Sequence, residues 1–288
     1  MKRIDCKALS EKIQNELKEA ISESGIVPGL AVIVVGDNPA SMTYVNNKRK
    51  SSEKVGIRSE VMYLPEDSTT EDVISAVQHF AARDDIHGVM TQLPMPEHID
   101  ASKVIASIPV EKDVDALTPA SLGKLLLGEH GFIPCTPRGI MNILRHEGVP
   151  LAGANCVVIG RSNIVGKPIA ALLTQADATV TLCHSKTKGL GKITKQADVV
   201  IAAVGKPGFI TADMISPGVV VIDVCINRNA DGKLVGDVCF DEVLQKAAAV
   251  TPVPGGVGVM TVTSLLENTY QAAKQLLNHN KSGGKVRE

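Results

Sequence analysis

The sequence contains no tryptophan and few other aromatic residues, three tyrosines and four phenylalanines among 288 residues. Proteins that bind single-stranded nucleic acid stack bases on aromatic side chains, so that function is not indicated. The formal net charge of −1 also lacks the basic excess with which proteins hold nucleic acid or an anionic membrane surface. We therefore expect neither nucleic acid nor a membrane as a partner.

Long apolar runs are absent as well. No stretch approaches the ~20 residues that span a bilayer, and residues 1–18 lack the apolar core of a signal peptide. The six cysteines are scattered and form no Cys-x-x-Cys pair, which is typical of reduced thiols in a cytoplasmic protein. The 44 % hydrophobic fraction and the length of the chain are instead sufficient for two globular domains.

Helical and strand-like patterns alternate along the first half of the chain. Residues 7–24 place an apolar side chain at every fourth position, which is typical of an amphipathic helix. Residues 29–36 are a continuous apolar run rich in β-branched side chains, which favours a central parallel strand. The order predicts a parallel sheet covered by helices on both faces. Its remaining elements are a helix at 40–55, a strand at 58–64, a helix at 70–82 and a strand at 88–91.

A domain boundary is expected within residues 92–138, which are richer in proline and glycine. The predicted fold is α/β with an N-terminal parallel αβα sheet domain, residues 1–138, and a C-terminal Rossmann-type domain, residues 139–288. A last helix, about residues 261–278, is expected to return and pack on the first domain. The strands expected in the second domain are 155–159, 178–182, 199–203, 219–223 and a short one near Val250.

The segment Gly160-Arg-Ser-Asn-Ile-Val-Gly166 follows a predicted strand and opens a predicted helix, which is the context of a dinucleotide-binding turn. Gly160 permits a tight turn, and the amides that follow it would point at phosphate from a helix N-terminus. Ser162 occupies the place of the second glycine in the usual fingerprint. An ordinary glycine-tightened turn between strand and helix is therefore the alternative interpretation.

The next predicted strand ends in Leu182-Cys-His184-Ser185-Lys186, with no acidic residue at its tip. An acidic residue there would hold the ribose 2′-hydroxyl of NAD and repel a 2′-phosphate. Arg161, Ser185 and Lys186 offer positive charge and a hydroxyl instead, which favours NADP. The second domain is therefore predicted to be a Rossmann-type NADP-binding domain.

Three segments of the first half carry polar side chains that could meet a ligand. Tyr44 and Lys48 lie one helical turn apart, either on a solvated face or facing an anionic substrate. Gln92 follows a strand at its carboxyl end, where open α/β sheets bind ligands. Lys112-Asp-Val-Asp115 is an acidic loop that is either a metal site or without function.

Near the end of the chain, the glycines of Pro254-Gly-Gly-Val-Gly258 would let backbone approach a flat ligand closely. The alternative is that they only form a turn into the last helix.

Taken together, these segments resemble the bifunctional methylenetetrahydrofolate dehydrogenase/methenyltetrahydrofolate cyclohydrolase family. Seven motifs match in family order and extend over both expected domains. They are Tyr44-Val-x-x-Lys48-x-Lys50 with Gly56-Ile57, Gln92-Leu-Pro-x-Pro96, Lys112-Asp-Val-Asp115, Pro134-Cys-Thr-Pro137, Gly160-Arg-Ser-x-Ile-Val-Gly-x-Pro168, Cys183-His-Ser185-x-Thr187 and Pro252-Val-Pro-Gly-Gly-Val-Gly258.

The resemblance implies NADP-dependent oxidation of 5,10-methylenetetrahydrofolate to the methenyl form and its hydrolysis to 10-formyltetrahydrofolate, in one-carbon metabolism. It implies a homodimer that binds tetrahydrofolate derivatives and NADP, with no metal ligand. Lys48 would be the main catalytic residue, Tyr44 and Gln92 would assist it, and Asp115 would hold the pterin ring. The implied folate contacts are Tyr44, Lys48, Gln92, Leu93, Asp115, Pro254, Gly255, Gly256, Val257 and Gly258. The implied NADP contacts are Gly160, Arg161, Ser162, Ser185 and Ile226.

The chain departs from the family pattern at positions that border the implied folate pocket. Ala116-Leu117-Thr118 replace the usual Gly-Phe and His or Asn, Ser121 replaces Asn, and Val259 replaces Pro. A monofunctional methylenetetrahydrofolate dehydrogenase of the same family is therefore the nearest alternative. More distant alternatives are an NADP-dependent reductase of another substrate and a binding protein without activity.

Overall fold

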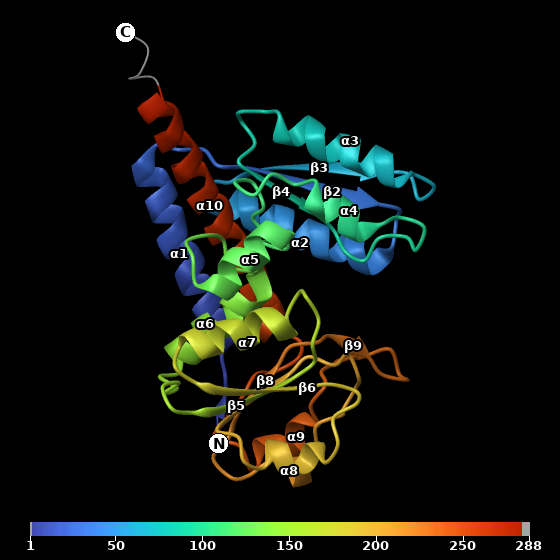
Figure 1. Cartoon of the computed structure of the whole chain (residues 1–288), viewed down its shortest axis with the longest axis vertical. Helices are drawn as coiled ribbons and strands as arrows, with labels where there is room; N and C mark the ends of the chain where they lie inside the picture. Colours follow the sequence, from blue (N-terminus) through green and yellow to red (C-terminus); the bar gives the residue numbers. More distant parts are fainter. Residues whose placement is uncertain (1, 284–288) are drawn as a thin grey trace. The chain divides into compact units, whose positions relative to one another are not determined.

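The computed structural model describes residues 2–283, so the last five residues of the expected second domain lie outside it. The chain forms two compact units, each built around a parallel sheet (Figure 1). The N-unit contains Lys12–Lys124, His130–Cys135 and the chain from Val262 onward. The C-unit contains the residues up to Glu11, together with Leu125–Glu129 and Thr136–Thr261.

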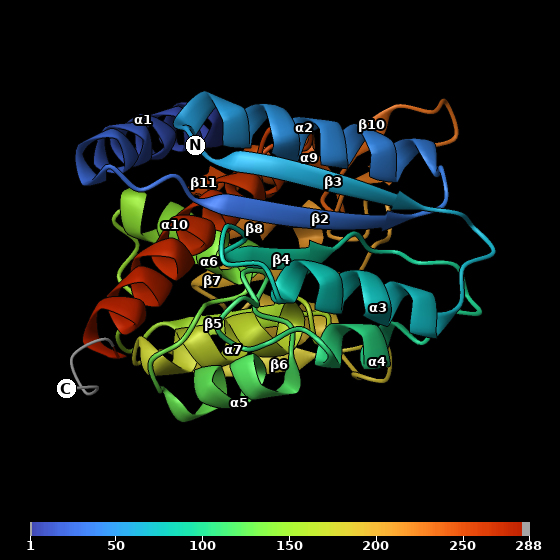
Figure 2. The same ribbon diagram turned by 90° about the horizontal axis from the view of Figure 1, so that it is seen from above.

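The sheet of the N-unit has three parallel strands, and the middle strand is buried on both faces. Its order is β3-β2-β4, with β2 at Gly29–Val35, β3 at Arg58–Leu64 and β4 at Gly88–Thr91 (Figure 2). The continuous apolar run that predicted a central parallel strand is thus explained, because alternate side chains of β2 enter two separate cores. These strands confirm the parallel sheet expected from the alternating pattern.

Helices cover both faces of this sheet (Figure 1). On one face, α3 and α4 pack against Ala31, Ile33 and Val35 of β2. On the other face, α1, α2 and α10 pack against Leu30 and Val32. The bounds of these helices are Cys6–Ser24 for α1, Pro39–Val55 for α2, Thr70–Ala81 for α3, Ala101–Ala106 for α4 and Val257–Gly283 for α10.

The last helix, α10, contributes to the core of the N-unit although the sequence reaches it after the C-unit. Leu265 and Leu266 share a hydrophobic cluster with Leu17 and Ile21 of α1. The hydroxyl of Tyr270 donates a hydrogen bond of 2.9 Å to the carbonyl oxygen of Ala20. The helix begins at Val257, four residues earlier than the apolar periodicity suggested.

The C-unit contains a six-stranded parallel sheet in the order β1-β11-β8-β7-β5-β6. A sheet whose strand order reverses between β5 and β7 is the doubly wound arrangement expected of a Rossmann-type domain. The strands are β1 Lys2–Arg3, β5 Asn155–Ile159, β6 Thr179–Cys183, β7 Val199–Ala202, β8 Val220–Asp223 and β11 Ala249–Val250. The other elements are α7 Gly166–Gln175, α8 Leu190–Thr194, η1 Ala212–Met214, α9 Phe240–Leu244 and the hairpin of β9 Asn227–Arg228 with β10 Leu234–Val235.

Some elements were not predicted from the sequence. The proline- and glycine-rich residues 92–138 include α4, α5 at Pro119–Leu127 and the start of α6 at Cys135–His146. The first strand, β1, pairs with β11 from the other end of the chain. Local patterns do not reveal such pairing, because a two-residue strand has no periodicity of its own.

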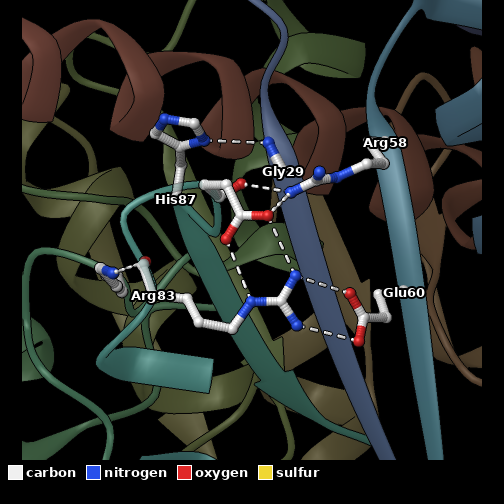
Figure 3. A network of polar contacts seen from close by, with 7 residues as sticks. Gly29, Arg58, Glu60, Arg83 and His87 are labelled. Atoms are coloured by element: carbon white, nitrogen blue, oxygen red, sulfur yellow. Dashed lines mark hydrogen bonds and ion pairs between the residues drawn. The ribbon is translucent and has the colours of Figure 1, made fainter. Parts of the chain in front are cut away.

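Charged side chains tie together the amino-terminal edge of the N-unit sheet (Figure 3). The carboxylate of Asp85 pairs with both Arg58 and Arg83, and Arg83 also binds Glu60 at 3.0 Å. The ring of His87 accepts a hydrogen bond of 3.0 Å from the amide of the first residue of β2. Groups that could bind a ligand are found at the opposite, carboxyl-terminal edge.

Candidate functional site

The amine of Lys48 is held against the carboxyl-terminal end of β4. Its Nζ donates a hydrogen bond of 3.0 Å to Oε1 of Gln92 and lies 3.6 Å from Sδ of Met90. The amide of Gln92 has a fixed orientation, because its Nε2 donates to the carbonyl oxygen of Leu93 at 2.6 Å. The backbone of Gln92 continues the sheet by donating to Ile33 at 2.8 Å. The structure therefore brings Lys48 and Gln92 together.

Lys48 and Asp115 are an electrostatically coupled pair. Burial lowers the pKa of the Lys48 amine, and the negative charge of Asp115 opposes this shift. Burial raises the pKa of the Asp115 carboxyl, while Lys48 and a hydrogen bond from the Cys135 thiol oppose that shift. Both groups are thus displaced toward their neutral forms. A lowered pKa favours the neutral amine, which is the form that is able to accept a proton.

The loop that carries Asp115 is held by its two preceding charged residues. Nζ of Lys112 donates to the carbonyl oxygens of Ala81 and Arg83 at 2.8 and 2.7 Å, at the end of α3. The fully buried carboxylate of Asp113 accepts bonds from the amide of Thr118 at 2.9 Å and the hydroxyl of Ser121 at 2.6 Å. Asp113 therefore shapes the loop on which Asp115 lies, a role that sequence inspection did not find.

Two departures from the family pattern belong to this loop. Ala116 has a φ of 56°, in the left-handed region where glycine is the usual residue. Ser121, in place of asparagine, supplies the hydroxyl that binds Asp113. The described residues include no group of three or more His, Cys, Asp or Glu that could hold a metal ion.

Tyr44 lies one turn before Lys48 on α2, and 37 % of its surface is exposed. Partial burial raises the pKa of its phenol. Within the described residues no hydrogen bond joins Tyr44 to Lys48, so the two share a helix face without direct contact between their polar atoms.

The turn after β5 has room only for glycine at both ends. A Cβ on Gly160 would lie 2.1 Å from the carbonyl oxygen of Ala203, and one on Gly166 would lie 2.0 Å from the carbonyl oxygen of Gly160. The hydroxyl of Ser162 accepts bonds from the amides of Val165 and Gly166 at 3.1 and 3.3 Å, at the start of α7. Ser162 thus stabilises the turn that the second glycine of the usual fingerprint would otherwise form. This geometry fits a dinucleotide phosphate approaching the first turn of α7.

The end of β6 presents polar groups without an acidic side chain. Its backbone is ordered locally, because the amide of His184 donates to Oγ1 of Thr187 at 2.9 Å and the ring of His184 accepts from the amide of Lys186 at 3.2 Å. Ser185 and Arg161 are exposed. Their side chains are accessible to a phosphate group on the ribose of a nucleotide.

A small pocket lies beyond the carboxyl-terminal end of β8. It is lined by Val224, Ile226 and residues 252–258. A Cβ on Gly256 would lie 2.2 Å from the carbonyl oxygen of Pro252, and Gly255 has a φ of 92°. These glycines are required by the fold of the segment itself, and they also leave backbone exposed to a ligand at the pocket.

Two features of this α/β chain together are characteristic of a nucleotide-dependent enzyme. The sheet of the C-unit carries a glycine-tightened turn of the kind that binds dinucleotide phosphate, and the N-unit carries a lysine whose amine is buried away from water. Family models agree with each half. Residues 4–115 match the catalytic domain of tetrahydrofolate dehydrogenase/cyclohydrolase, and residues 134–277 match its NAD(P)-binding domain. The chain belongs to the tetrahydrofolate dehydrogenase/cyclohydrolase family.

Relatives support this assignment over nearly the whole length. The bifunctional protein FolD of Lysinibacillus sphaericus is 52 % identical over 277 residues, which cover 95 % of this chain and 98 % of that protein. The crystal structure of bifunctional FolD from Campylobacter jejuni has a TM-score of 0.92 and 48 % identity, covering 94 % of this chain and 98 % of that one. A Trypanosoma brucei FolD structure in complex with NADP and an inhibitor has a TM-score of 0.91 and 38 % identity, covering 95 % and 97 %.

These findings confirm the predicted family, the two-domain α/β fold and an enzyme with an NAD(P)-binding domain. The individual roles of Lys48, Tyr44, Gln92 and Asp115 stay predictions. No helix among the described residues is both long and apolar enough to cross a membrane.

Proposed function

We propose that the chain carries out two consecutive reactions on a folate-bound one-carbon unit. The first is NADP-dependent oxidation of 5,10-methylenetetrahydrofolate to 5,10-methenyltetrahydrofolate, and the second is hydrolysis of that product to 10-formyltetrahydrofolate. The observation that carries the proposal is the desolvated Lys48 amine held by Gln92 at 3.0 Å. Oxidation alone does not require such a group, whereas hydrolysis does.

Hydrolysis needs a proton carrier close to the methenyl carbon. Water adds to this carbon and loses one proton, which leaves a hydroxyl group on the carbon between N5 and N10. The hydroxyl then loses its proton as the formyl C=O forms, the carbon–N5 bond breaks, and N5 takes up a proton, so that one proton is released to solvent overall. The neutral Lys48 amine is suited to accept the proton from water, and the resulting ammonium is suited to donate it to N5. The carbonyl oxygen of Gln92 directs the amine throughout. Tyr44, one turn earlier on α2, would shield the amine from solvent or donate a hydrogen bond to the substrate.

Asp115 would bind the pterin ring. A carboxylate accepts two hydrogen bonds from an amino-pyrimidine edge, and Asp113 holds the loop in place beneath it. Burial raises the pKa of Asp115, and hydrogen bonds from a bound pterin would oppose this shift by stabilising the charged carboxylate. Leu93, which follows Gln92, would contact the same ligand.

The C-unit residues fit NADP, whose nicotinamide accepts the hydride when it is bound. The tight turn at Gly160 and Ser162 would receive the pyrophosphate at the start of α7. Arg161 and Ser185, both exposed, would bind the 2′-phosphate. Ile226 and the backbone of residues 254–258 line the pocket that would receive a flat ring.

A spectrophotometric assay tests the proposal. With methylenetetrahydrofolate and NADP, the purified protein should produce methenyl absorbance that rises and then decays. Absorbance that rises and persists would identify a monofunctional dehydrogenase. Absence of any change with either NADP or NAD would exclude the oxidation, and stable absorbance of added methenyltetrahydrofolate in the presence of the protein would exclude the hydrolysis.

We further propose a cytoplasmic homodimer that does not bind nucleic acid. All six cysteines are free thiols, as in proteins of reducing compartments. The seven-residue strand β3 lies at an edge of its sheet with Tyr63 49 % exposed, and such edges are usually covered. Light scattering after gel filtration would give twice the monomer mass, and a single-chain mass would contradict the dimer.

A further inference from the structure

The loop that follows β7 lies against the dinucleotide turn. The carbonyl oxygen of Ala203 is the atom that a Cβ on Gly160 would strike, so the two backbones are in direct contact. In sheets of this type a dinucleotide extends over the carboxyl ends of the strands on both sides of the point where the order reverses. If the 2′-phosphate of the adenosine half binds at β6, as proposed above, the nicotinamide half would lie over β7 and β8. The conformation of the loop after β7 would therefore affect where the nicotinamide half of the cofactor binds.

A buried carboxylate holds this loop. Asp237 is fully buried, and its Oδ2 accepts hydrogen bonds from the amides of Val204 at 2.7 Å and Gly205 at 3.0 Å. Its Oδ1 accepts from the amide of Lys206 at 2.8 Å. Successive amides that point at one place form an anion-binding concavity, which often receives a ligand phosphate. Here an internal carboxylate fills it.

The same carboxylate is joined to the end of β8. Oδ1 of Asp237 also accepts a bond of 2.9 Å from the side-chain amide of Asn227, the residue after Ile226. The thiol of Cys225 is a further donor to Asp237. Residues from the ends of two neighbouring strands thus converge on one buried anion, and one of these segments lines the small pocket.

A second carboxylate fixes Asp237 in turn. Asp223, the last residue of β8, accepts bonds from the amides of Asp237 at 2.9 Å and Val238 at 3.0 Å. The approach is close enough that a Cβ on Gly236 would lie 1.8 Å from Oδ2 of Asp223. The Gly236-Asp237 segment therefore cannot shift without breaking contacts with β8.

We infer that Asp237 is a positioning residue for the nicotinamide half of NADP, acting through the Val204–Lys206 loop and Asn227 without touching the cofactor. This inference rests on the proposed function. Hydride transfer requires close alignment of two rings, and a misplacement of about 1 Å can lower the rate roughly 100-fold. Hydrolysis of the methenyl compound does not use the nucleotide, so it should not depend on Asp237.

The test is Asp237→Asn, which keeps the size of the side chain but turns one acceptor into a donor facing amides. We expect the Kd of NADP, measured by calorimetry without folate, and the KM of NADP to rise about tenfold or more. Hydrolysis of methenyltetrahydrofolate by the same preparation should stay within about twofold of wild type. Asp241→Asn changes an exposed carboxylate on α9 and is the matched control.

Asn227→Ala provides a second variant, because it removes one donor and leaves the three amide bonds to Asp237 intact. It should raise the Kd of NADP severalfold while leaving hydrolysis unchanged. If Asp237→Asn does not fold, the Kd of NADP for Asn227→Ala alone tests the inference. Unchanged NADP affinity in both folded variants would overturn the inference, as would an equal loss of oxidation and hydrolysis. Failure of the proposed function is distinguishable, since wild type itself would then neither oxidise nor hydrolyse folates.

Discussion

Lys48 and Gln92, which are separated by 43 residues in the sequence, are joined by a hydrogen bond of 3.0 Å from Nζ to Oε1. The bond links a helix to the end of a parallel strand, and burial of the amine at this place lowers its pKa. A lysine on an exposed helix face would keep its ordinary pKa and its positive charge, since water stabilises the charged form. The environment of Lys48 is therefore suited to proton transfer.

Replacing Lys48 by methionine should separate the two proposed reactions. Methionine keeps much of the apolar stem and removes the amine, so hydrolysis should fall by about 100-fold or more, the loss expected for a general acid–base group. Oxidation should fall less, because hydride transfer needs alignment and no amine. The methenyl product would then accumulate, which is visible as a lasting absorbance.

Lys54→Met is the matched control, since Lys54 is exposed in the last turn of the same helix. It should leave both activities near wild type. Normal hydrolysis by Lys48→Met would contradict the proposed role. Loss of both activities together would show that Lys48 is needed for folate binding or for hydride transfer as well.

The sequence was sufficient for the two sheets apart from β1, because their other strands are mostly apolar runs separated by helical segments. It was not sufficient for Asp237, an acidic residue after a glycine that has the local pattern of an exposed loop. Only the folded chain brings the amides of Val204–Lys206 around it. The role of Asp113 could not be predicted for the same reason. Its partners Thr118 and Ser121 come close to it only through the conformation of the loop, which leaves no periodic pattern in the sequence.

Cofactor choice can be tested at Arg161, which is exposed beside the dinucleotide turn. Arg161→Ala should weaken NADP by about ten- to a hundredfold and NAD much less, since one charge-assisted contact to phosphate contributes roughly 1.5–3 kcal/mol. Affinities for both nucleotides are measured by calorimetry. Lys192→Ala, which removes an exposed charge on α8, should change neither. Equal losses for NADP and NAD would show that Arg161 does not bind the 2′-phosphate.

The role of Asp115 can be separated from a purely structural one. Asp115→Ala should raise the KM of folate about 100-fold or more in both reactions, because two hydrogen bonds to a charged acceptor are lost. The affinity for NADP should not change, since the dinucleotide turn belongs to the C-unit. A melting curve and the exposed variant Asp84→Ala are the controls. Unchanged folate affinity would remove Asp115 from the binding site.

The carboxyl group of Asp223 should make the stability of the protein depend on pH. Burial raises the pKa of this group from its ordinary 3.8 to about 7, and the neighbouring Asp237 adds to the shift, while hydrogen bonds from the amides of Asp237 and Val238 oppose it. A group with a raised pKa in the folded state binds a proton there that the unfolded chain has already released. Its contribution to stability is therefore fully present below about pH 4 and is lost as the pH rises through about 7.

Asp223→Asn cannot ionise, so this dependence should disappear in the variant. Between about pH 4.5 and 7, the unfolding free energy of wild type should fall relative to that of the variant by about 1 kcal/mol per pH unit. Above about pH 8 the difference should become constant, because Asp223 is then ionised in both states of wild type. Denaturant titrations at a series of pH values measure the difference, in which the other titrating groups cancel. Asp241→Asn, at an exposed position, should reproduce the wild-type slope. Parallel curves for wild type and Asp223→Asn over this range would mean that the carboxyl group at the end of β8 is already ionised in the folded protein.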